Sequence, residues 1–378
     1  MIPWAVLLTA AWVAFLVLEH RSLRRARESV PVRIMVTGTR GKSSLVRLLT
    51  AGARVAEPST WGKITGDVPT LLTPDGDEVI RRRAGARLAE QGWLLRMCRR
   101  GGVHCLVVEA MTITPDLMKA EARLLLPSVI ALVNVRDDHQ ETLGDDPAQQ
   151  RQAYLDSLPA RSRVVTRDPA LVALLPRAEQ TRQPAAADHA DLLATLAPVQ
   201  RELVLLADEV LAALGWSSAA ALQAMVEAAR PMEGAPRRVA WQQGEAVLLD
   251  AFSANDTESL AALWDGWRGT LGAGRPWSVV LATRADRPLR TRRFCAWLAG
   301  RDDVDAVYVT GSHRHAARAL LRRSGVAVHD IDPRLAPLAL LEGSVAAPLD
   351  SERPVLVGMG NARGLGLALR AKEAGEVA

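Results

Sequence analysis

The chain has 378 residues, enough for two or three domains with separate cores, and its 49% hydrophobic and 24% charged residues are typical of a globular protein. Its net charge of +5 does not indicate nucleic-acid binding, because two of those charges lie within residues 1–30 and no basic tract is interleaved with aromatic residues. We therefore expect no nucleic-acid partner. The cysteines have no zinc-ligand spacing, which predicts buried, reduced thiols in a cytosolic domain: Cys98, Cys105 and Cys295.

The first segment, Ile2 to Leu18, contains no charged residue and is, as a helix, just long enough to span a bilayer core. Trp4 suits the membrane interface, and the arginines that follow the apolar run suit the cytoplasmic side. A cleaved signal peptide is the alternative, but its positive charge would precede the apolar run, and here the arginines follow it. The sequence predicts an uncleaved, single-pass anchor in the cell membrane, with the N-terminus outside and the catalytic domains in the cytoplasm.

Short, continuous apolar runs follow the anchor at Val32–Thr37, His104–Glu109 and Val129–Val135. Such runs are typical of strands that are buried on both faces of a parallel sheet. A helix is predicted from Ser43 to about Val55, and the Ala- and Leu-rich stretch 145–229 is predicted to be mostly helical.

Two prolines and a glycine in Arg230–Pro236 indicate a domain boundary. Beyond it, strand-like runs alternate with helices at Ala246–Leu249, Trp277–Leu281, Ala306–Val309 and Pro354–Val357. The predicted fold class is α/β, with a P-loop-type parallel-sheet central domain, a Rossmann-like C-terminal domain and an N-terminal transmembrane helix. The expected segments are 1–30, 31–235 and 236–378.

The strongest motif is Gly38-Thr39-Arg40-Gly41-Lys42-Ser43-Ser44, between a predicted strand and a predicted helix. Glycines let a backbone wrap a phosphate, helix N-terminal amides attract it, and Lys42 can reach terminal phosphates while Ser43 ligates magnesium. The usual P-loop has four residues between its first glycine and Gly-Lys, whereas this chain has two. A simple glycine turn between strand and helix is the alternative interpretation.

Two further side chains follow predicted strands. Glu109 ends one apolar run, and His139 lies just past another. Because ligands of open parallel sheets bind at the carboxyl ends of the strands, we expect Lys42, Glu109 and His139 to converge there beside a nucleotide-bound magnesium. Surface positions for Glu109 and His139 are the alternative.

The compressed loop, Gly-Thr-x-Gly-Lys-Ser, resembles the phosphate loop of the Mur-ligase superfamily, which includes folylpolyglutamate synthases. Asn134-x-x-x-Asp138-His139 resembles the superfamily's Asn-x-x-Asp-His element with one extra residue, and Asp250–Asp256 resembles the element that opens the third Mur domain. Other stretches, in family order from about residue 33 to 366, are similar to the poly-γ-glutamate synthase B subunit of capsule-type systems. They are Lys63–Gly66, Thr73–Gly76, Glu109–Met111, Thr283–Arg287 and Gly358–Asn361.

The resemblance implies a role for each matching position. ATP would be held by Gly38, Thr39, Arg40, Gly41, Lys42, Ser43 and Ser44, and by Asp250 at the ribose, an arginine of the Arg237-Arg238 pair (Arg238) and Asn255. Mg²⁺ would be held by Ser43, Glu109 and His139, and the catalytic residues would be Lys42, Glu109 and His139. Thr65 and Gly66 would form a second loop near the γ-phosphate. Gly358–Gly366 would either hold the glutamyl substrate or form an ordinary Rossmann turn.

The chain departs from the superfamily at one ligand. Most Mur ligases carry a carbamylated lysine beyond the metal-binding histidine, but here no lysine lies between Lys119 and Lys372. Either Glu141 or Asp145 replaces it at a second magnesium, or that second site is absent.

The resemblance implies an ADP-forming, ATP-dependent acid–amino-acid ligase that polymerises glutamate through γ-carboxyl linkages by way of an acyl phosphate. Its cofactors would be ATP and Mg²⁺, and its partners glutamate, the growing poly-γ-glutamate chain, the membrane bilayer and the small membrane subunits of a synthase complex, with homo-oligomerisation left open. One alternative is a related ligase with a diffusible acceptor such as folate, which would not need the anchor. The other is a nucleotide-binding subunit that energises a membrane export complex without ligation.

Overall fold

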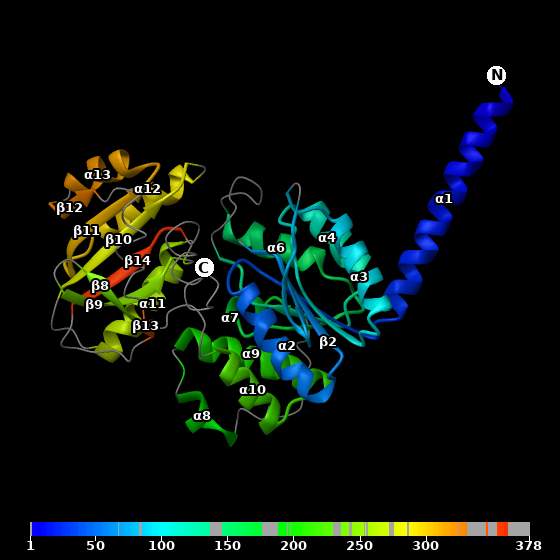
Figure 1. Ribbon diagram of the computed structural model, residues 1–378, viewed down its shortest axis with the longest axis horizontal. Helices are drawn as coiled ribbons and strands as arrows, with labels where there is room; N and C mark the ends of the chain where they lie inside the picture. Colours follow the sequence, from blue (N-terminus) through cyan, green and yellow to red (C-terminus); the bar gives the residue numbers. More distant parts are fainter. Residues whose placement is uncertain are drawn as a thin grey trace. The chain divides into compact units, whose positions relative to one another are not determined.

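The computed structural model of the chain describes residues 2–66, 68–82, 85–136, 146–175, 188–194, 196, 198–229, 236–241, 244–252, 254, 256–271, 276–285, 287–323, 325–330, 345–346 and 354–361. These residues form two compact units (Figure 1). Unit 1 comprises Met1–Leu196 and Gln200–Ala229, and unit 2 comprises Ala197–Val199 and Arg230–Ala378.

Unit 1 is built on a seven-stranded sheet with strand order β4-β3-β2-β5-β1-β6-β7. The strands from β2 to β7 in this order are parallel, whereas β3 and β4 form an antiparallel extension at one edge. The central strand β1 pairs with β5 on one side and β6 on the other, so the carboxyl ends of these three strands lie next to one another. The bounds are β1 (Val32–Thr37), β2 (Thr60–Ile64), β3 (Thr70–Thr73), β4 (Gly76–Val79), β5 (Cys105–Glu109), β6 (Val129–Leu132) and β7 (Arg163–Val165).

Helices cover both faces of this sheet, as its apolar strands require (Figure 1). On one face, α3 and α4 pack their buried leucines against Met35, Leu106 and Val108. On the other face α2 packs against α10, so closely that a Cβ on Gly52 would lie 2.8 Å from Met225. The bounds are α1 (Ile2–Glu28), α2 (Lys42–Ala56), α3 (Ala89–Arg100), α4 (Pro115–Leu125), α6 (Pro147–Ser157), α7 (Pro169–Val172), α8 (Ala190–Ala194), α9 (Pro198–Leu214) and α10 (Ala219–Ala229).

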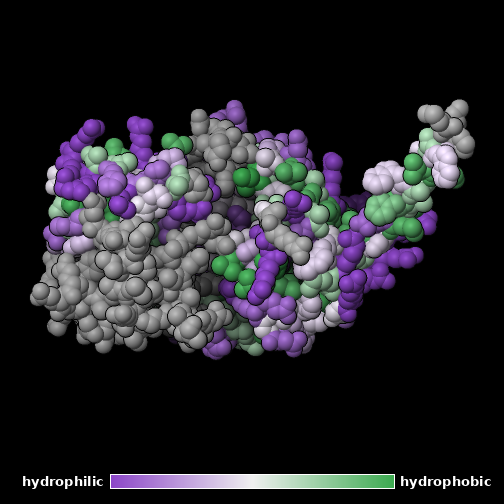
Figure 2. Space-filling view, turned by 45° about the horizontal axis from the view of Figure 1, so that its top comes forward, coloured by the Kyte–Doolittle hydropathy of each residue, from purple (hydrophilic) through white to green (hydrophobic). Residues whose placement is uncertain are grey.

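Helix α1 has two different halves. Its apolar part is exposed from Trp4 to Leu18, and the helix is long and apolar enough to cross a membrane by length and composition. Its second half packs on α3, where Ala26 and, just beyond the helix, Val30 are fully buried in the core of unit 1. Arg96 of α3 also pairs with Glu19 of α1. Figure 2 shows green, hydrophobic residues on the projecting end of α1 and purple, hydrophilic residues nearer to unit 1.

Unit 2 is a second seven-stranded sheet, with strand order β12-β11-β10-β14-β9-β8-β13. Its strands are parallel from β12 to β9, and β8 and β13 are antiparallel additions. Side chains from α11, α12 and α13 cover one face in a core that contains Trp264 and Phe294. The bounds are β8 (Pro236–Trp241), β9 (Gly244–Ala251), α11 (Thr257–Leu271), β10 (Trp277–Thr283), α12 (Pro288–Ala299), β11 (Val304–Gly311), α13 (Arg314–Arg322), β12 (Ala327–Asp330), β13 (Val345–Ala346) and β14 (Val355–Met359).

The architecture confirms the predicted fold class, an α/β chain with two parallel sheets and one apolar N-terminal helix. The run Val129–Val135 forms a shorter strand than expected, because the chain leaves the sheet after Leu132. The predicted helical stretch 145–229 also contains the short strand β7. All three cysteines are buried and unpaired, as expected, and burial raises the pKa of the Cys98 and Cys105 thiols to about 12.

Candidate active site

The phosphate loop joins the carboxyl end of β1 to the first turn of α2, as the motif predicts. Gly38 and Gly41 have φ angles of +122° and +78°, which favour glycine. At Gly38 there is also no room for a side chain, because a Cβ would lie 2.6 Å from the carbonyl oxygen of Asn134. The loop therefore runs against the chain that leaves β6.

Asn134 fixes the shape of this loop. The Thr39 amide donates to the Asn134 carbonyl (2.9 Å), and the Thr39 hydroxyl and the Arg40 amide donate to the Asn134 side-chain oxygen (2.8 and 3.1 Å). The Thr39 hydroxyl in turn accepts a hydrogen bond from the Arg136 amide (2.9 Å). The sequence placed Asn134 in a family element but gave it no task. Here it connects the ends of β1 and β6.

The loop presents positive groups to a ligand. Lys42 Nζ donates to the carbonyl oxygens of Gly38 (2.7 Å) and Thr39 (3.2 Å), so its ammonium lies along the loop. Helix α2 begins after Gly41 with no side-chain hydrogen bond capping its first turn. Its first amides, which include those of Ser43 and Ser44, are groups that bind phosphate at helix N-termini.

An oxygen cluster lies beside the loop. Ser43 Oγ donates to Glu109 Oε2 (2.8 Å), and the Thr65 amide donates to the same oxygen (2.8 Å). The Thr65 hydroxyl donates to the Glu109 carbonyl (3.3 Å), and a Cβ on Gly66 would lie 3.0 Å from Ser43 Oγ. The structure thus brings α2, β5 and the loop after β2 together at the Glu109 carboxylate, whose residue is 5% exposed.

The donors in this cluster fit a magnesium ion. A serine hydroxyl and a carboxylate are hard oxygen ligands, the type that Mg²⁺ prefers, and both lie beside the loop that would hold nucleotide phosphates. Within the described residues no group of three or more His, Cys, Asp or Glu side chains could hold a metal. The expected third ligand, His139, lies outside the described residues, as do Glu141 and Asp145.

The remaining expected nucleotide contacts belong to unit 2. Asp250 is 2% exposed near the end of β9, where its carboxylate accepts a hydrogen bond from the Phe252 amide (3.0 Å). Arg238 lies on β8 opposite Val247, but its side chain is outside the described part, and so is Asn255.

The carboxyl ends of β10, β11 and β14 carry further polar groups, and two of them, Thr283 and Asn361, belong to stretches that carry the sequence resemblance. The Thr283 hydroxyl donates to Thr310 O (2.8 Å) and accepts from the His313 amide (3.0 Å). Asn361, at the end of β14, contacts Arg290 and Ala282. Gly360 approaches Ala282 so closely that a Cβ would lie 2.2 Å from its carbonyl oxygen. Of the Gly358–Gly366 loop, only residues 358–361 are described, and they lie against the end of β10.

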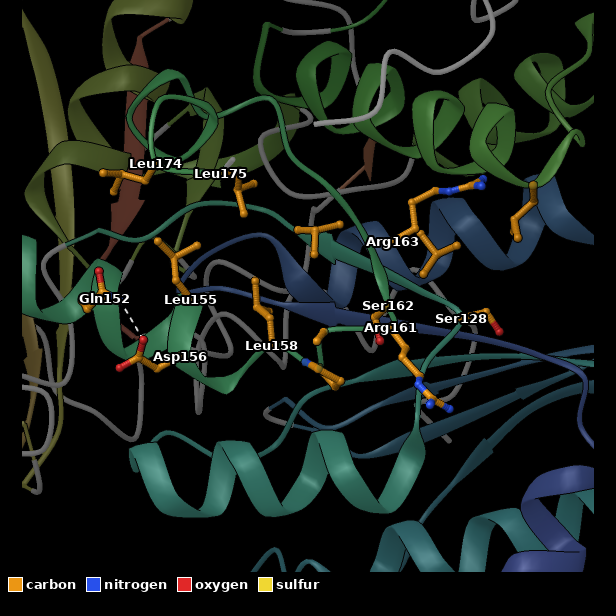
Figure 3. Close-up of a pocket in the computed structure, with 15 residues that line it drawn as sticks. Ser128, Gln152, Leu155, Asp156, Leu158, Arg161, Ser162, Arg163, Leu174 and Leu175 are labelled. Atoms are coloured by element: carbon orange, nitrogen blue, oxygen red, sulfur yellow. Dashed lines mark hydrogen bonds between the residues drawn. The ribbon is translucent and has the colours of Figure 1, made fainter. Parts of the chain in front are cut away.

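A cavity of about 960 Å³ in unit 1 does not belong to this site (Figure 3). Its walls include Ser128 and Arg163 at the amino ends of β6 and β7, and the hydrogen-bonded pair Gln152 and Asp156 on α6. The phosphate loop and Glu109 lie at the opposite, carboxyl ends of the strands, where α/β sheets bind ligands. Chemistry and topology, not cavity size, therefore locate the candidate site.

The fold is that of Mur ligases and folylpolyglutamate synthases. Escherichia coli FolC in complex with DHPP and ADP aligns with a TM-score of 0.61 at 13% identity, covering 94% of this chain and 92% of that one. A bifunctional folylpolyglutamate synthase/dihydrofolate synthase from Yersinia pestis, complexed with AMPPNP and Mn ion, aligns with a TM-score of 0.58 at 14% identity, covering 97% and 98%. MurC from Thermotoga maritima gives 0.56 at 14% identity, covering 94% and 78%. Because these identities are low, the structural alignments show a common fold and not a common activity.

Comparisons of sequence give a more specific similarity than this shared fold. Residues 237–375 match the family model of the poly-gamma-glutamate synthase CapB C-terminal domain. PGA synthase CapB of Bacillus subtilis strain 168 is 26% identical over 308 residues, 77% of this chain and 77% of that protein. Capsule biosynthesis protein CapB of Bacillus anthracis is 26% identical over 289 residues, 73% of this chain but only 62% of that protein's length. These matches confirm the resemblance to the poly-γ-glutamate synthase B subunit.

Proposed function

We propose that the protein is an ATP-dependent amide ligase that polymerises glutamate through its γ-carboxyl group. The observation that carries this proposal is the meeting of Ser43, Thr65 and Glu109 beside the phosphate loop at the carboxyl ends of β1, β2 and β5. The CapB relatives support glutamate as the substrate, and the nucleotide complexes of the fold neighbours support ATP with a divalent metal.

The reaction would run in two steps, phosphorylation of a carboxylate and displacement of the phosphate by an amine. A glutamate γ-carboxylate oxygen attacks the γ-phosphorus of ATP, the bond from that phosphorus to the β-phosphate oxygen breaks, and ADP leaves. The amine of another glutamate then attacks the acyl phosphate carbon, so that a C–N bond forms, phosphate departs and the amine loses a proton. Phosphorylation is needed because a carboxylate is a poor electrophile.

Each residue of the site has a task in this scheme. Lys42 and the first amides of α2 would neutralise phosphate charge while the γ-phosphoryl group is transferred, which is how most catalysis of phosphoryl transfer is achieved. Ser43 and Glu109 would hold Mg²⁺, which would supply positive charge to neutralise the phosphates of the nucleotide. His139 is proposed as a further ligand, and Arg238, Asp250 and Asn255 as nucleotide contacts from unit 2.

The apolar N-terminal helix suggests where the protein would work in the cell. Helix α1 would anchor the protein as a single-pass membrane protein whose two units work in the cytoplasm. Glutamate, the growing chain and small membrane subunits of a synthase complex would be its partners.

The test is product formation by the purified full chain in detergent or nanodiscs. We expect ATP, Mg²⁺ and glutamate to yield ADP, phosphate and γ-linked oligomers, and Lys42→Ala to abolish all three products while preserving the thermal unfolding midpoint. Lys119→Ala, a lysine substitution on α4, is the matched control and should retain wild-type turnover. ATP hydrolysis without an amide product would favour the export-energising alternative and refute the ligase. More than a few per cent of wild-type turnover in Lys42→Ala would refute the assigned loop.

A further inference from the structure

A chain of polar and charged side chains runs from the partly buried Arg82 and Glu90 into the interior of unit 1, next to the candidate site. Lys63 on β2 is fully buried, and its Nζ lies 2.6 Å from Glu90 Oε1 and donates to Gln91 Oε1 (3.1 Å). Gln91 Nε2 donates to Glu121 Oε1 on α4 (2.6 Å), and Arg82 donates to both Glu90 oxygens (2.7 Å each). We call these five residues the buried network.

The two ends of the buried network, Arg82 and Glu121, are hydrogen-bonded to the two loops that flank Glu109. At one end, Arg82 Nη1 donates to the carbonyl oxygen of Thr65 (3.4 Å), the residue whose amide donates to the Glu109 carboxylate. At the other end, Glu121 accepts from the amides of Met111 (3.1 and 3.2 Å) and Thr112 (3.1 Å), and from the Thr112 hydroxyl (2.6 Å). These loops directly follow β2 and β5.

Stability alone does not account for the buried network. Lys63, Gln91 and Glu121 are at most 1% exposed, and removing charges from water costs several kcal/mol per ion. Burial accordingly lowers the pKa of Lys63, although the hydrogen bond and charge of Glu90 oppose that change. Buried ion pairs can often be replaced by apolar side chains without loss of stability, and the surrounding layer, which includes Leu94, Leu95 and Val108, is apolar. What apolar side chains could not do is form directed hydrogen bonds to both loops.

We propose that the buried network positions the Glu109 carboxylate, by holding the Thr65 loop through Arg82 and the Met111–Thr112 loop through Glu121, with Lys63 as the central ion that joins the two. This inference rests on the proposed function, because it assigns these residues to the metal-binding Glu109. They are positioning residues, since their hydrogen bonds reach the two loops and not the Glu109 side chain itself. Residues that orient the ligands of a metal change metal affinity by about 10- to 100-fold when they are lost.

The experiment compares Lys63→Met, which removes the central charge, with Gln91→Leu, which interrupts the network but leaves its four charges. Arg33→Met is the matched control. Arg33 is a partly buried cation that donates to the backbone carbonyls of Leu125 and Leu126. It lies at the amino end of β1, so it is at the end of the strands opposite to the candidate site. All variants are made in the full chain in nanodiscs, and their unfolding midpoints are measured.

The first readout is amide hydrogen exchange of the protein without ligand. If the buried network holds the two loops, exchange at Thr65 and at Met111–Thr112 becomes about tenfold faster or more in Lys63→Met and Gln91→Leu. In Arg33→Met, exchange at these amides should equal that of the wild type. Wild-type exchange rates in both network variants would overturn the inference, and this arm does not depend on any ligand. Should Lys63→Met not fold, Gln91→Leu alone decides it.

The second readout is binding of a non-hydrolysable ATP analogue as a function of Mg²⁺ concentration. We expect the Mg²⁺ concentration for half-maximal binding to rise about tenfold or more in both network variants. Affinity measured without metal should stay within about twofold, since the phosphate loop keeps its own contacts. Faster exchange with an unchanged Mg²⁺ requirement would overturn the assignment to Glu109. A wild-type protein that binds no analogue would instead refute the proposed function, while the exchange result would still test the network.

Discussion

Gly38 offers a sharp test of the phosphate loop, because unit 1 contains a matched second glycine. Gly38 and Gly76 have similar positive φ angles, +122° and +139°. A Cβ on Gly76 would meet nothing within 4 Å, whereas a Cβ on Gly38 would lie 2.6 Å from the carbonyl oxygen of Asn134. Replacing each by alanine therefore separates backbone strain from collision.

The expected magnitudes follow from these two facts. An alanine in a conformation that favours glycine costs roughly 1–3 kcal/mol at either position. Gly38→Ala must also move the loop from Asn134 by roughly 0.8 Å, the difference between the 2.6 Å contact and the 3.4 Å at which ordinary contact begins. A misplacement of about 1 Å in a catalytic site can lower the rate about 100-fold. We expect Gly38→Ala to lose about that factor in ATP-dependent turnover and Gly76→Ala to keep wild-type turnover.

Calorimetric titration with ATP, turnover and thermal unfolding of both variants form the assay. Thermal unfolding shows whether the two proteins are comparably folded, so that a loss of turnover can be assigned to the loop. Turnover of Gly38→Ala within about threefold of that of Gly76→Ala would refute the reasoning. It would mean that the close approach of Gly38 to Asn134 is not needed for the loop to bind phosphate.

Two other predictions concern the anchor and unit 2. Deleting residues 1–18 should leave the core of unit 1 intact, but deleting residues 1–30 also removes the buried Ala26 and Val30 and should lower the free energy of unfolding by about 2–4 kcal/mol. Equal urea midpoints for the two truncated proteins would contradict this. Burial alone would raise the pKa of Asp303, but hydrogen bonds from an arginine and a tryptophan hold it below its usual value. Asp303 therefore stabilises the fold above about pH 4, the usual Asp pKa, and this stabilisation is lost as the pH falls through the lower folded pKa. Asp303→Asn should lower the thermal unfolding midpoint at pH 7, measured by tryptophan fluorescence. If the midpoints of the variant and the wild type differed by the same amount at pH 3, the assignment would be refuted.

The parts of the fold that could be predicted are those in which local pattern and tertiary role agree. Val32–Thr37 has the unbroken, fully buried apolar run Ile34–Val36 in an interior strand of the sheet, and its glycine turn and following helix are encoded in adjacent residues. Strand β2 was missed because its burial depends on distant partners. In Thr60–Ile64, Lys63 interrupts the apolar pattern, and its buried position depends on Glu90 and Gln91 of α3.

The same distinction holds for the candidate site. Ser43 and Glu109 could be placed at one edge because parallel strands have their carboxyl ends together, and the structure puts their oxygens 2.8 Å apart. The roles of Asn134 and Glu121 could not be read, because each depends on hydrogen bonds that form only in the folded chain. The Asn134 side chain accepts from Thr39 and Arg40, about 95 residues earlier, and Glu121 accepts from backbone amides of the loop that precedes its own helix. The extra residue between Asn134 and Asp138 belongs to a segment that continues outside the described residues, so the position of His139 stays a prediction.

In the proposed reaction, this site joins a carboxylate to an amine by way of an acyl phosphate. The fate of oxygen-18 in the γ-carboxyl group of labelled glutamate distinguishes this route from hydrolysis, using the purified full chain with ATP and Mg²⁺. The proposed reaction predicts that each phosphate released carries one labelled oxygen and that γ-amide forms in equal amount. Phosphate that takes its oxygen from water, released without amide, would contradict the claim.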